Sequence, residues 1–504
     1  MNDFWARLQQ HPSQHVALIG ATQSLTYGQL LSAVNSRASW LSQQPHQRFA
    51  MALANDIEWV LFDLACAKAH KTCIPLPEFF HPEQLKHVLS DANVDAILVA
   101  PDMPQRHAID TAQYSIQTEW PFAAQLALYR RSQTAPALAC HKLTYTSGST
   151  GKPKAVALTL VQQVDVVQAI ATQITATVAE VHLSVLPLCV LLENIAGVWL
   201  NLWLGAVTQL VPLPQLGFSG SAQFNQAVFG KALQQLLPSS MILTPALAAL
   251  VVQFAKQHDP LRQRLRFLAV GGAPVPSQLL AQAAQLGLPL YQGYGLSEAA
   301  SVISLNSPQQ QRLGSVGKLL NNRQVKIVDG ELWVTGGLAS GYLQQNTIQP
   351  LPLTAGWYAT GDLAHLDSDG FVYIDGRKKD VLVTAFGRNV APSWVEAEAL
   401  LSPAWRQFYL TLSPTNELLA IIYPAPDATA SSISAGLQQL NARLPDYAQV
   451  KYWHRATEAF TPDNGMLTAN GRLRRRQIDA NYQPILQALA GFNEITQMTE
   501  ITEV

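Results

Sequence analysis

The sequence is poor in charge and in cysteine, and both shortages exclude classes of protein. Only 13% of its 504 residues are charged and the formal net charge is −1, so the chain has no general attraction for nucleic acid or anionic membranes. Its four cysteines, Cys66, Cys73, Cys140 and Cys189, show no Cys-x-x-Cys spacing, which indicates neither a zinc site nor a disulfide framework. We expect them to pack in the core of a protein in a reducing, cytoplasmic environment.

Long hydrophobic runs are missing too. No stretch of 18 apolar residues occurs, so the sequence predicts no membrane span. The most apolar region, Leu183 to Leu213, is interrupted by Pro187, Glu193, Asn194 and Asn201, and a buried helix is the better interpretation. The N-terminus lacks a basic start followed by an apolar run, so no signal peptide is predicted.

Two common catalytic patterns are also lacking. None of the 12 histidines falls in a His-Glu-x-x-His pattern, so a hydrolytic zinc site is unsupported. No Gly-x-Ser-x-Gly segment occurs, which counts against an α/β-hydrolase.

What the sequence does contain is the alternation of strands and helices typical of an α/β protein. Its length exceeds that of one ordinary core, so two or three domains are expected. Residues 96–100 and 267–270 are apolar strand candidates, and Tyr27 to Leu41 is a candidate amphipathic helix. Such alternation favours mainly parallel sheets covered by helices on both faces.

The pattern changes near residue 310 and again after residue 376. Asp-Gly turns separate three short strand candidates, at 325–328, 331–334 and 371–374. These predict a small antiparallel β subdomain. We therefore predict an α/β fold with a large N-terminal domain over residues 1–376 and a small, mobile α+β C-terminal domain over 377–504.

The most informative segment is 146–154, Thr-Ser-Gly-Ser-Thr-Gly-Lys-Pro-Lys, which directly follows a strand candidate. A strand that enters such a loop can surround a polyphosphate with backbone N–H groups, hydroxyls and ammonium groups. The loop is not a Walker A motif, because two residues separate Gly148 from Gly151 and Pro153 follows Lys152. Alone, such a loop is more often a flexible linker.

Further segments carry polar residues suited to a nucleotide. Glu298 directly follows a strand candidate, and a carboxylate beside a phosphate loop suggests Mg²⁺ between them; in isolation it is equally a solvated helix-start carboxylate. Asp362, expected at a turn, can accept hydrogen bonds from ribose hydroxyls, although an Asp after Gly is more often a plain turn residue. Arg377 could reach ribose or phosphate. The last segment, 464–476, ends in a basic cluster that on its own is usually a solvated face.

In this order and spacing the segments resemble the acyl-adenylate-forming (AMP-binding) superfamily: acyl-CoA synthetases, adenylation domains of peptide synthetases, and luciferases. The resemblance runs from Ser24-Leu-Thr-Tyr to Arg476. Leu186-Pro-Leu-Cys-Val-Leu-Leu-Glu resembles the Leu-Pro-Leu-x-His-x-x-Glu segment of long-chain fatty acyl enzymes, and 387–396 resembles their C-terminal signature.

The resemblance implies ATP-dependent activation of a carboxylic acid, of medium or long chain, to an acyl-AMP. The acyl group then passes to the thiol of CoA or of a phosphopantetheinyl carrier protein. ATP and Mg²⁺ are the implied cofactors, with no nucleic-acid partner. Two alternatives stay open: a relative that couples the adenylate to a non-thiol nucleophile, and a non-catalytic protein that only binds ATP.

The resemblance also implies roles for individual residues. The catalytic positions are Lys154, Ser297, Glu298 and Arg472, and the magnesium positions are Thr150 and Glu298. The remaining nucleotide-binding positions are Thr146, Ser147, Gly148, Ser149, Thr150, Gly151, Gly272, Tyr294, Gly295, Asp362 and Arg377. Lys379 falls where the family places its interdomain hinge.

The sequence departs from the family pattern in several places. Arg472 replaces the adenylation lysine, and a planar guanidinium is not equivalent to a compact ammonium; it can still bridge carboxylate and α-phosphate, slow the first step, or mark use of an adenylate made elsewhere. Val190 stands where relatives carry a tunnel-gating histidine, and segment 186–194 lacks an aspartate for a substrate amino group, which argues against an amino acid. Trp199 and Trp203 either shorten the acyl pocket or, more often for such a pair, belong to the core.

Overall fold

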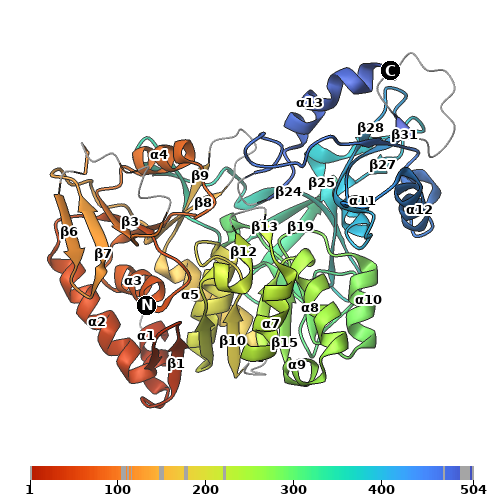
Figure 1. The fold of residues 1–504 in the computed structure, drawn as a ribbon. Coiled ribbons are helices and arrows are strands. Elements are labelled where there is room, and N and C mark those ends of the chain that lie inside the picture. Colours follow the sequence, from red (N-terminus) through yellow and green to blue (C-terminus); the bar gives the residue numbers. More distant parts are fainter. Residues whose placement is uncertain are drawn as a thin grey trace.

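The computed structural model describes residues 3–103, 109, 113–114, 116–146, 153–174, 180–219, 223–468, 471–488 and 500–501. Within them the chain forms two nine-stranded sheets, a five-stranded sheet and a four-stranded C-terminal sheet. Figure 1 shows the C-terminal elements, in blue, gathered at one end of the molecule.

The first large sheet is parallel in its centre and antiparallel at its edges. In spatial order its strands are β18 (Lys318–Leu319), β17 (Ser304–Leu305), β16 (Leu290–Tyr294), β15 (Phe267–Val270), β14 (Ser240–Leu243), β10 (Val181–Ser184), β11 (Val207–Leu210), β1 (Val16–Ile19) and β2 (Ser24–Thr26). The strands from β16 to β1 run parallel, whereas β18, β17 and β2 are antiparallel to their neighbours. The strand predicted at 267–270 is confirmed as β15.

The second large sheet repeats this plan with a shorter parallel centre. Its strands, in spatial order, are β22 (Thr347–Gln349), β21 (Gly341–Gln344), β9 (Lys154–Leu158), β8 (Lys142–Thr146), β4 (Thr72–Pro75), β3 (Arg48–Ala52), β5 (Ala96–Val99), β7 (Ala123–Arg130) and β6 (Ile116–Trp120). Strands β8, β4, β3 and β5 run parallel, and the others are antiparallel. The prediction of parallel sheets is therefore met in the centre of both sheets.

Helices cover both faces of each large sheet. Between the sheets lie α1 (Asp3–Gln10), α2 (Tyr27–Gln43), α3 (Ile57–Lys68), α5 (Leu160–Gln173) and the π-helix η2 (Glu193–Trp199), which continues as α6 (Leu200–Leu204). The outer face of the first sheet carries α7 (Gln226–Leu236), α8 (Pro245–Gln257), α9 (Asp259–Arg264) and α10 (Ser277–Gln285). The outer face of the second carries α4 (Pro82–Asp91). The short elements η3 (Leu213–Leu216), β12 (Phe218–Ser219) and β13 (Gln223–Phe224) precede α7.

Strand β3 explains the layering at the level of the sequence. Side chains alternate across a strand, so Phe49 and Met51 join the core between the sheets while Ala50 and Ala52 join the core under α4. All four are fully buried. An apolar residue at every position is the pattern of a strand covered on both faces.

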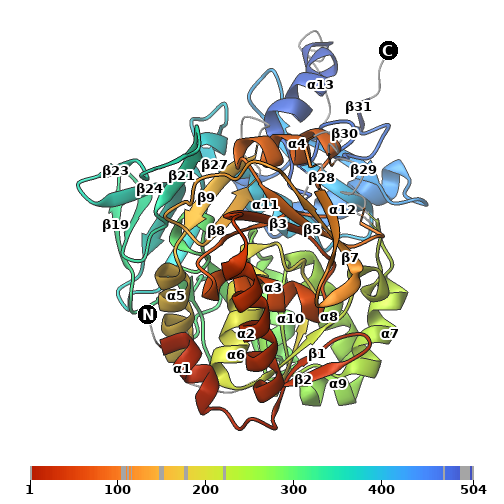
Figure 2. The same ribbon diagram turned by 90° about the vertical axis from the view of Figure 1, so that its left-hand side faces the viewer.

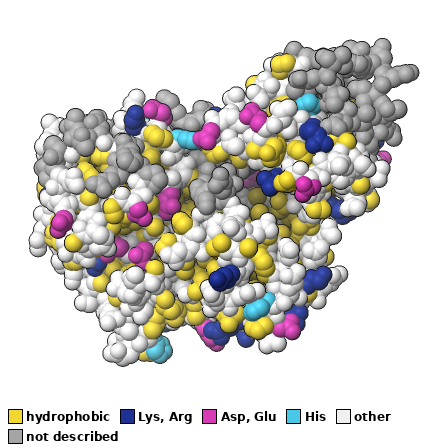
Figure 3. All heavy atoms as spheres, in the orientation of Figure 1, with side chains coloured by type: hydrophobic (Ala, Val, Ile, Leu, Met, Phe, Trp, Pro, Cys, Tyr) yellow, Lys and Arg dark blue, Asp and Glu magenta, His cyan; other side chains and the backbone are white. Residues whose placement is uncertain are grey.

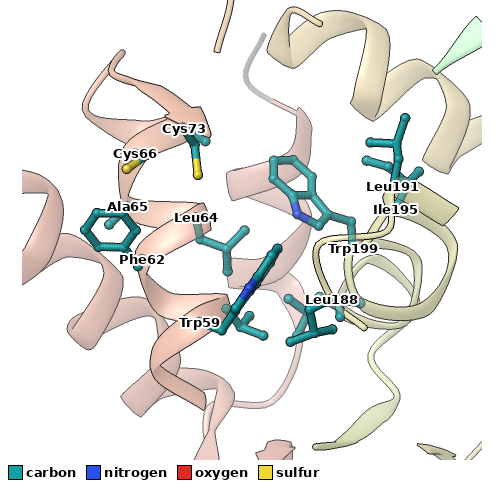
Figure 4. Close-up of a cluster of buried hydrophobic side chains, with 14 of the residues drawn as sticks. Trp59, Phe62, Leu64, Ala65, Cys66, Cys73, Leu188, Leu191, Ile195 and Trp199 are labelled. Carbon is teal, nitrogen blue, oxygen red and sulfur yellow. The ribbon is translucent and has the colours of Figure 1, made fainter. Parts of the chain in front are cut away.

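The core between the sheets contains the tryptophans that the sequence left open. Figure 4 shows Trp59 of α3 and Trp199 of η2 facing each other among aliphatic side chains. Trp199 is fully buried and Trp203 packs against the same core, so the pair belongs to the core. Cys66 and Cys73 point into this core as well.

Two expectations about apolar and cysteine residues are met with small differences. Region 183–213 is the end of β10, the buried η2–α6 helix, and β11. None of the described helices is long and apolar enough to cross a membrane. Cys66, Cys73 and Cys140 are buried free thiols, but Cys189 is partly exposed.

The five-stranded sheet is antiparallel, as predicted. It consists of β19 (Gln324–Val328), β20 (Glu331–Thr335), β23 (Leu353–Thr354), β24 (Trp357–Leu366) and β25 (Val372–Arg377). The Asp329-Gly330 turn joins β19 to β20. Figure 2 shows β19, β23 and β24 along one edge of the molecule, beside α5 and below β9 and β21.

The C-terminal part combines helices with one mixed sheet. It comprises η5 (Lys378–Asp380), the hairpin β26 (Leu382–Val383) and β27 (Asn389–Val390), α11 (Pro392–Ala399), β28 (Trp405–Leu412), β29 (Leu418–Pro424), α12 (Ala430–Asn441), η6 (Asp446–Ala448), β30 (Tyr452–Arg455), α13 (Arg475–Ala488) and β31 (Glu500–Ile501). It has its own core, which includes Val395, Leu410, Ile433 and Trp453. On the face shown in Figure 3, acidic and basic side chains are interspersed.

Candidate active site

The carboxyl ends of β15 and β16 carry five of the residues singled out in the sequence. Gly272 follows β15, Tyr294 ends β16, and Gly295, Ser297 and Glu298 follow it, the last two in the 3₁₀-turn η4 (Ser297–Ala299). Ligands of α/β sheets bind outside the carboxyl ends of the parallel strands. These residues therefore lie at the edge of the sheet where a ligand is expected.

Two of these positions require glycine. Gly272 has φ +81°, and no heavy atom lies within 4 Å of where its Cβ would be, so the backbone faces open space in a conformation that disfavours other residues. A Cβ on Gly295 would lie 1.7 Å from the carbonyl oxygen of Ser301. The chain therefore folds back on itself directly before Glu298.

The second large sheet brings Thr146 and Lys154 to the site. They are paired across the antiparallel strands β8 and β9, and the Thr146 hydroxyl donates to the Lys154 carbonyl at 3.4 Å. The loop that joins them includes Ser147, Gly148, Ser149, Thr150 and Gly151, which lie outside the described residues. The two strands thus fix both ends of the predicted phosphate loop.

The antiparallel sheet supplies a carboxylate that gathers several partners, the Asp362 cluster, consisting of Asp362, Tyr294, Arg377 and Arg472. The Tyr294 hydroxyl donates to Asp362 Oδ2 at 2.5 Å, and Arg377 Nε lies 2.5 Å from Oδ1. Asp362 is 4% exposed. Burial raises the pKa of Asp362, and the charge of Arg377, the Tyr294 hydrogen bond and the charge of Arg472 oppose that rise.

One detail of the Asp362 prediction was wrong. The residue does not lie at a turn but within the ten-residue strand β24. Gly361, with φ +75°, precedes it, and the register between β24 and β25 shifts immediately after it. Such an irregularity re-aims a side chain next to an active site, which explains why the Gly-Asp pair looked like a turn in the sequence.

Arg472 reaches this site from the C-terminal part of the chain. One of its terminal guanidinium nitrogens donates to the Gly272 carbonyl at 3.4 Å, 200 residues away in sequence. Its backbone is held in a tight loop, in which Arg472 N donates to the Thr468 hydroxyl at 2.9 Å and Arg472 O accepts from Thr468 N at 2.7 Å. The replaced lysine position therefore still presents a cation to the site.

A second group, the Glu298 cluster, consists of Glu298, Tyr342, Tyr358 and Lys154. The Tyr342 hydroxyl donates to Glu298 Oε1 at 2.8 Å and lies 3.0 Å from the Tyr358 hydroxyl. Lys154 Nζ lies 4.2 Å from the centre of the Tyr342 ring, within cation–π range. No described residue makes a hydrogen bond to Glu298 Oε2, so that oxygen can bind a further group.

The two clusters form one site. Tyr358 and Asp362 both lie on β24, and the charges of Glu298, Arg377 and Asp362 all act on Tyr358, whose pKa is raised chiefly by burial. Four parts of the chain therefore supply the site: both large sheets, the antiparallel sheet and the C-terminal loop.

The chemistry of the site fits a nucleotide that arrives with Mg²⁺. Among the described residues no group of three His, Cys, Asp or Glu could hold a metal alone. Mg²⁺ is usually held by one or two carboxylates together with substrate phosphates, and Glu298 supplies one such carboxylate. Lys154, Arg377 and Arg472 supply positive charge near it.

Tyr342 and Tyr358 were missed by sequence reasoning. Their role follows from the pairing of β21 with β9, which sets Tyr342 opposite Val156, and of β20 with β24. A tyrosine inside a strand gives no local sequence signal of such a role. Only the position of Tyr358, four residues before Asp362, hinted at it.

Comparison with known proteins agrees with this geometry. The model of the family described as "AMP-binding enzyme" matches residues 4–343. The chain belongs to this family. It is 26% identical over 542 aligned positions to the long-chain-fatty-acid–CoA ligase FadD15 of Mycobacterium bovis, covering 89% of each chain. It is 25% identical to the 2-succinylbenzoate–CoA ligase of Bacillus subtilis, covering 78% of this chain and 80% of the relative.

Solved structures of AMP-binding enzymes share the fold. The anthranilate CoA ligase AuaEII in complex with anthranoyl-AMP has a TM-score of 0.77 at 17% identity, covering 95% of this chain and 97% of that one. The o-succinylbenzoate CoA synthetase of Bacillus subtilis with ATP and a magnesium ion has a TM-score of 0.73 at 22% identity, covering 95% and 99%. At these identities the likeness shows the fold.

Proposed function

We propose that this AMP-binding enzyme is an acid–thiol ligase that makes an acyl-AMP from ATP and a carboxylic acid and then transfers the acyl group to a thiol. The observation that carries the proposal is the convergence of Lys154, Glu298, Asp362 and Arg472 at one site. In the first step a carboxylate oxygen attacks the α-phosphorus and pyrophosphate leaves. In the second a thiol attacks the acyl carbon, AMP leaves, and the thiol proton is released.

The first step brings anions together, so the placement of cations and donors should supply most of the acceleration. We assign Lys154 and Arg472 to neutralise phosphate and carboxylate charge, and Asp362 with Arg377 to bind the ribose. Thr146 and loop residues 147–151 are assigned to the phosphates. Magnesium, when bound, would neutralise phosphate charge, with Glu298 and Thr150 as its protein ligands and Ser297 beside the α-phosphate.

We propose an aliphatic acid of medium or long chain as the substrate. The support is the resemblance of 186–193 to the fatty acyl enzymes and the FadD15 relatives. The acidic residue of that segment, Glu193, is fully buried and accepts hydrogen bonds from Ser184 at 2.6 Å and His182 at 3.0 Å. It is therefore committed to the core, which leaves no carboxylate there for an amino group. Aromatic acids, the substrates named for several relatives, are the competing class.

CoA is the acceptor we favour, because the curated relatives that span most of this chain include several CoA ligases. A phosphopantetheinyl carrier protein is the alternative, since a subunit of linear gramicidin synthase of Brevibacillus parabrevis is 26% identical over 94% of this chain. The domain boundary near residue 376 and the hinge at Lys379 remain predictions of this proposal.

The decisive experiment incubates the purified protein with ATP, MgCl₂ and single acids, with CoA or a pantetheinylated carrier protein, and weighs the products. The panel contains octanoic, hexadecanoic, 2-succinylbenzoic and anthranilic acids. We expect hexadecanoyl- or octanoyl-CoA, together with acid-dependent exchange of pyrophosphate into ATP. ATP binding without exchange for any acid would mean a non-catalytic protein, and product with the carrier alone would exclude the CoA ligase.

A further inference from the structure

Tyr342 lies between two oppositely charged groups of the site and contacts both. Its hydroxyl donates to Glu298 Oε1 at 2.8 Å, and Lys154 Nζ lies 4.2 Å from the centre of its ring. The side chain is 9% exposed. One buried residue therefore fixes both the carboxylate and the ammonium.

The direction of the hydrogen bonds follows from the number of protons. A tyrosine has one hydroxyl proton, and Tyr342 gives it to the Glu298 carboxylate. The contact of 3.0 Å between the two hydroxyls must then use the proton of Tyr358. Burial raises the pKa of Tyr342 far above its ordinary value, so the hydroxyl remains a donor throughout the accessible pH range.

The backbone holds Tyr342 in place. It lies on β21, paired with Val156 of β9, the strand that begins at Lys154. The neighbouring Ser340 N donates to Ala157 O at 3.0 Å, and Ala339 N donates to Glu298 O at 2.7 Å. The segment 339–342 is thus hydrogen-bonded to both the Lys154 strand and the Glu298 turn.

We propose that Tyr342 is a positioning residue that orients the Glu298 carboxylate toward Mg²⁺ and holds the Lys154 ammonium at a fixed separation from it. This inference rests on the proposed function, because it concerns how the same site takes up a metal–nucleotide complex. With Oε1 occupied by the tyrosine, Glu298 presents Oε2 in one orientation. The ring leaves the Lys154 ammonium over an apolar surface, where it stays apart from the carboxylate.

The two contacts can be separated by substitution. Tyr342→Phe removes the hydrogen bond to Glu298 but keeps a ring under Lys154, whereas Tyr342→Leu removes both. Tyr452→Phe is the matched control, because Tyr452 donates to Glu417 Oε2 at the same 2.8 Å but lies in the C-terminal sheet. Tyr358→Phe weakens the chain from its far end and serves if Tyr342→Phe does not fold.

The measurement is ATP binding by calorimetry with excess MgCl₂ and with EDTA, alongside the KM values for ATP and acid. A hydrogen bond to a charged group predicts that Tyr342→Phe weakens ATP binding in Mg²⁺ roughly tenfold, with binding in EDTA unchanged. Tyr342→Leu should weaken binding in both conditions, and Tyr358→Phe should weaken it in Mg²⁺ by roughly two- to threefold. Tyr452→Phe should match the unmodified protein.

The outcomes distinguish this inference from the proposed function. Mg²⁺-dependent ATP binding that is equal in Tyr342→Phe and the unmodified protein would overturn the positioning role and leave the proposed function standing. If Tyr342→Phe does not fold, unchanged binding by Tyr358→Phe has the same meaning. ATP binding that does not depend on Mg²⁺ in the unmodified protein would overturn both.

Discussion

At the scale of single residues, the site surrounds one buried carboxylate with cations. Asp362 pairs with Arg377 at 2.5 Å and feels the charge of Arg472. Because Arg377 is already committed to Asp362, Arg472 is the cation of this cluster best placed to meet an incoming anion. Its polar contact to the described residues at the site is the long 3.4 Å bond to the Gly272 carbonyl, which an incoming substrate could readily replace.

Arg472→Ala should therefore abolish adenylation while leaving ATP affinity nearly unchanged. The loss of one charge-assisted interaction is worth about 1.5–3 kcal/mol, and the effect should appear in kcat for pyrophosphate exchange. Arg472→Lys should hold or raise the rate. Equal exchange rates in Arg472→Ala and the unmodified protein would show that another group carries the charge.

A second residue-scale prediction concerns Glu78, in the loop after β4. Burial, assisted by Asp102, raises its pKa from 4.5 to about 6. A raised pKa in the folded state means that its contribution to stability is complete below pH 4.5 and is lost as pH rises through 6. Glu78→Gln should therefore be more stable than the unmodified protein at pH 7, by at most about 2 kcal/mol, and equal to it near pH 4. Denaturant unfolding at both pH values measures this, with the exposed Glu83→Gln as a control that should show no such difference.

At the scale of elements, local strands and turns were predictable and their partners were not. The strands at 96–100, 267–270 and 325–334 follow from apolar patterns and the Asp329-Gly330 turn. The pairing of β21 with β9 joins strands about 180 residues apart, and nothing local in the sequence encodes it. Tyr342 was missed for this reason, whereas Glu298 and Asp362 were found through motifs.

Asn55 illustrates how separate elements are joined beside the site. It follows β3 of the second sheet, is 1% exposed, donates to Leu186 O at 2.8 Å and accepts from Leu188 N at 2.9 Å. Leu186 and Leu188 follow β10 of the first sheet. A single amide thus ties the carboxyl ends of the two sheets together.

Asn55→Ala would leave a buried carbonyl and a buried N–H unpaired, which should cost roughly 2–4 kcal/mol of unfolding free energy. Since the segment after β10 is the proposed acyl side of the site, the KM for the acid should rise more than the KM for ATP. Asn225→Ala, which removes the cap of α7, should cost about 1 kcal/mol without changing the ratio of the two KM values. A rise in both KM values by the same factor would count against the acyl-side assignment.

At the scale of the whole molecule, the C-terminal part is held against the large domain by a buried carboxylate. Glu398 of α11 is 4% exposed, and its Oε1 accepts from both the backbone N and the hydroxyl of Ser277, each at 2.9 Å. Ser277 begins α10, so the carboxylate lies at the positive end of that helix. Arg443 supports Glu398 by donating to its carbonyl at 3.0 Å. This contact exists in the arrangement that places Arg472 beside Gly272.

If the C-terminal domain must rotate between the two half-reactions, as the hinge at Lys379 predicts, this contact must break before the thiol step. Glu398→Gln and Ser277→Ala should then lower the population of the present arrangement and slow pyrophosphate exchange, by roughly three- to tenfold for the loss of a charge-assisted bond. Transfer from a preformed acyl-AMP to the thiol should not slow, because the arrangement that performs it does not contain the bond. Glu417→Gln, which removes a carboxylate of the C-terminal sheet with no partner in the large domain, should change neither half-reaction. Equal slowing of both half-reactions by Glu398→Gln would mean that the contact serves stability alone and that the two steps share one domain arrangement.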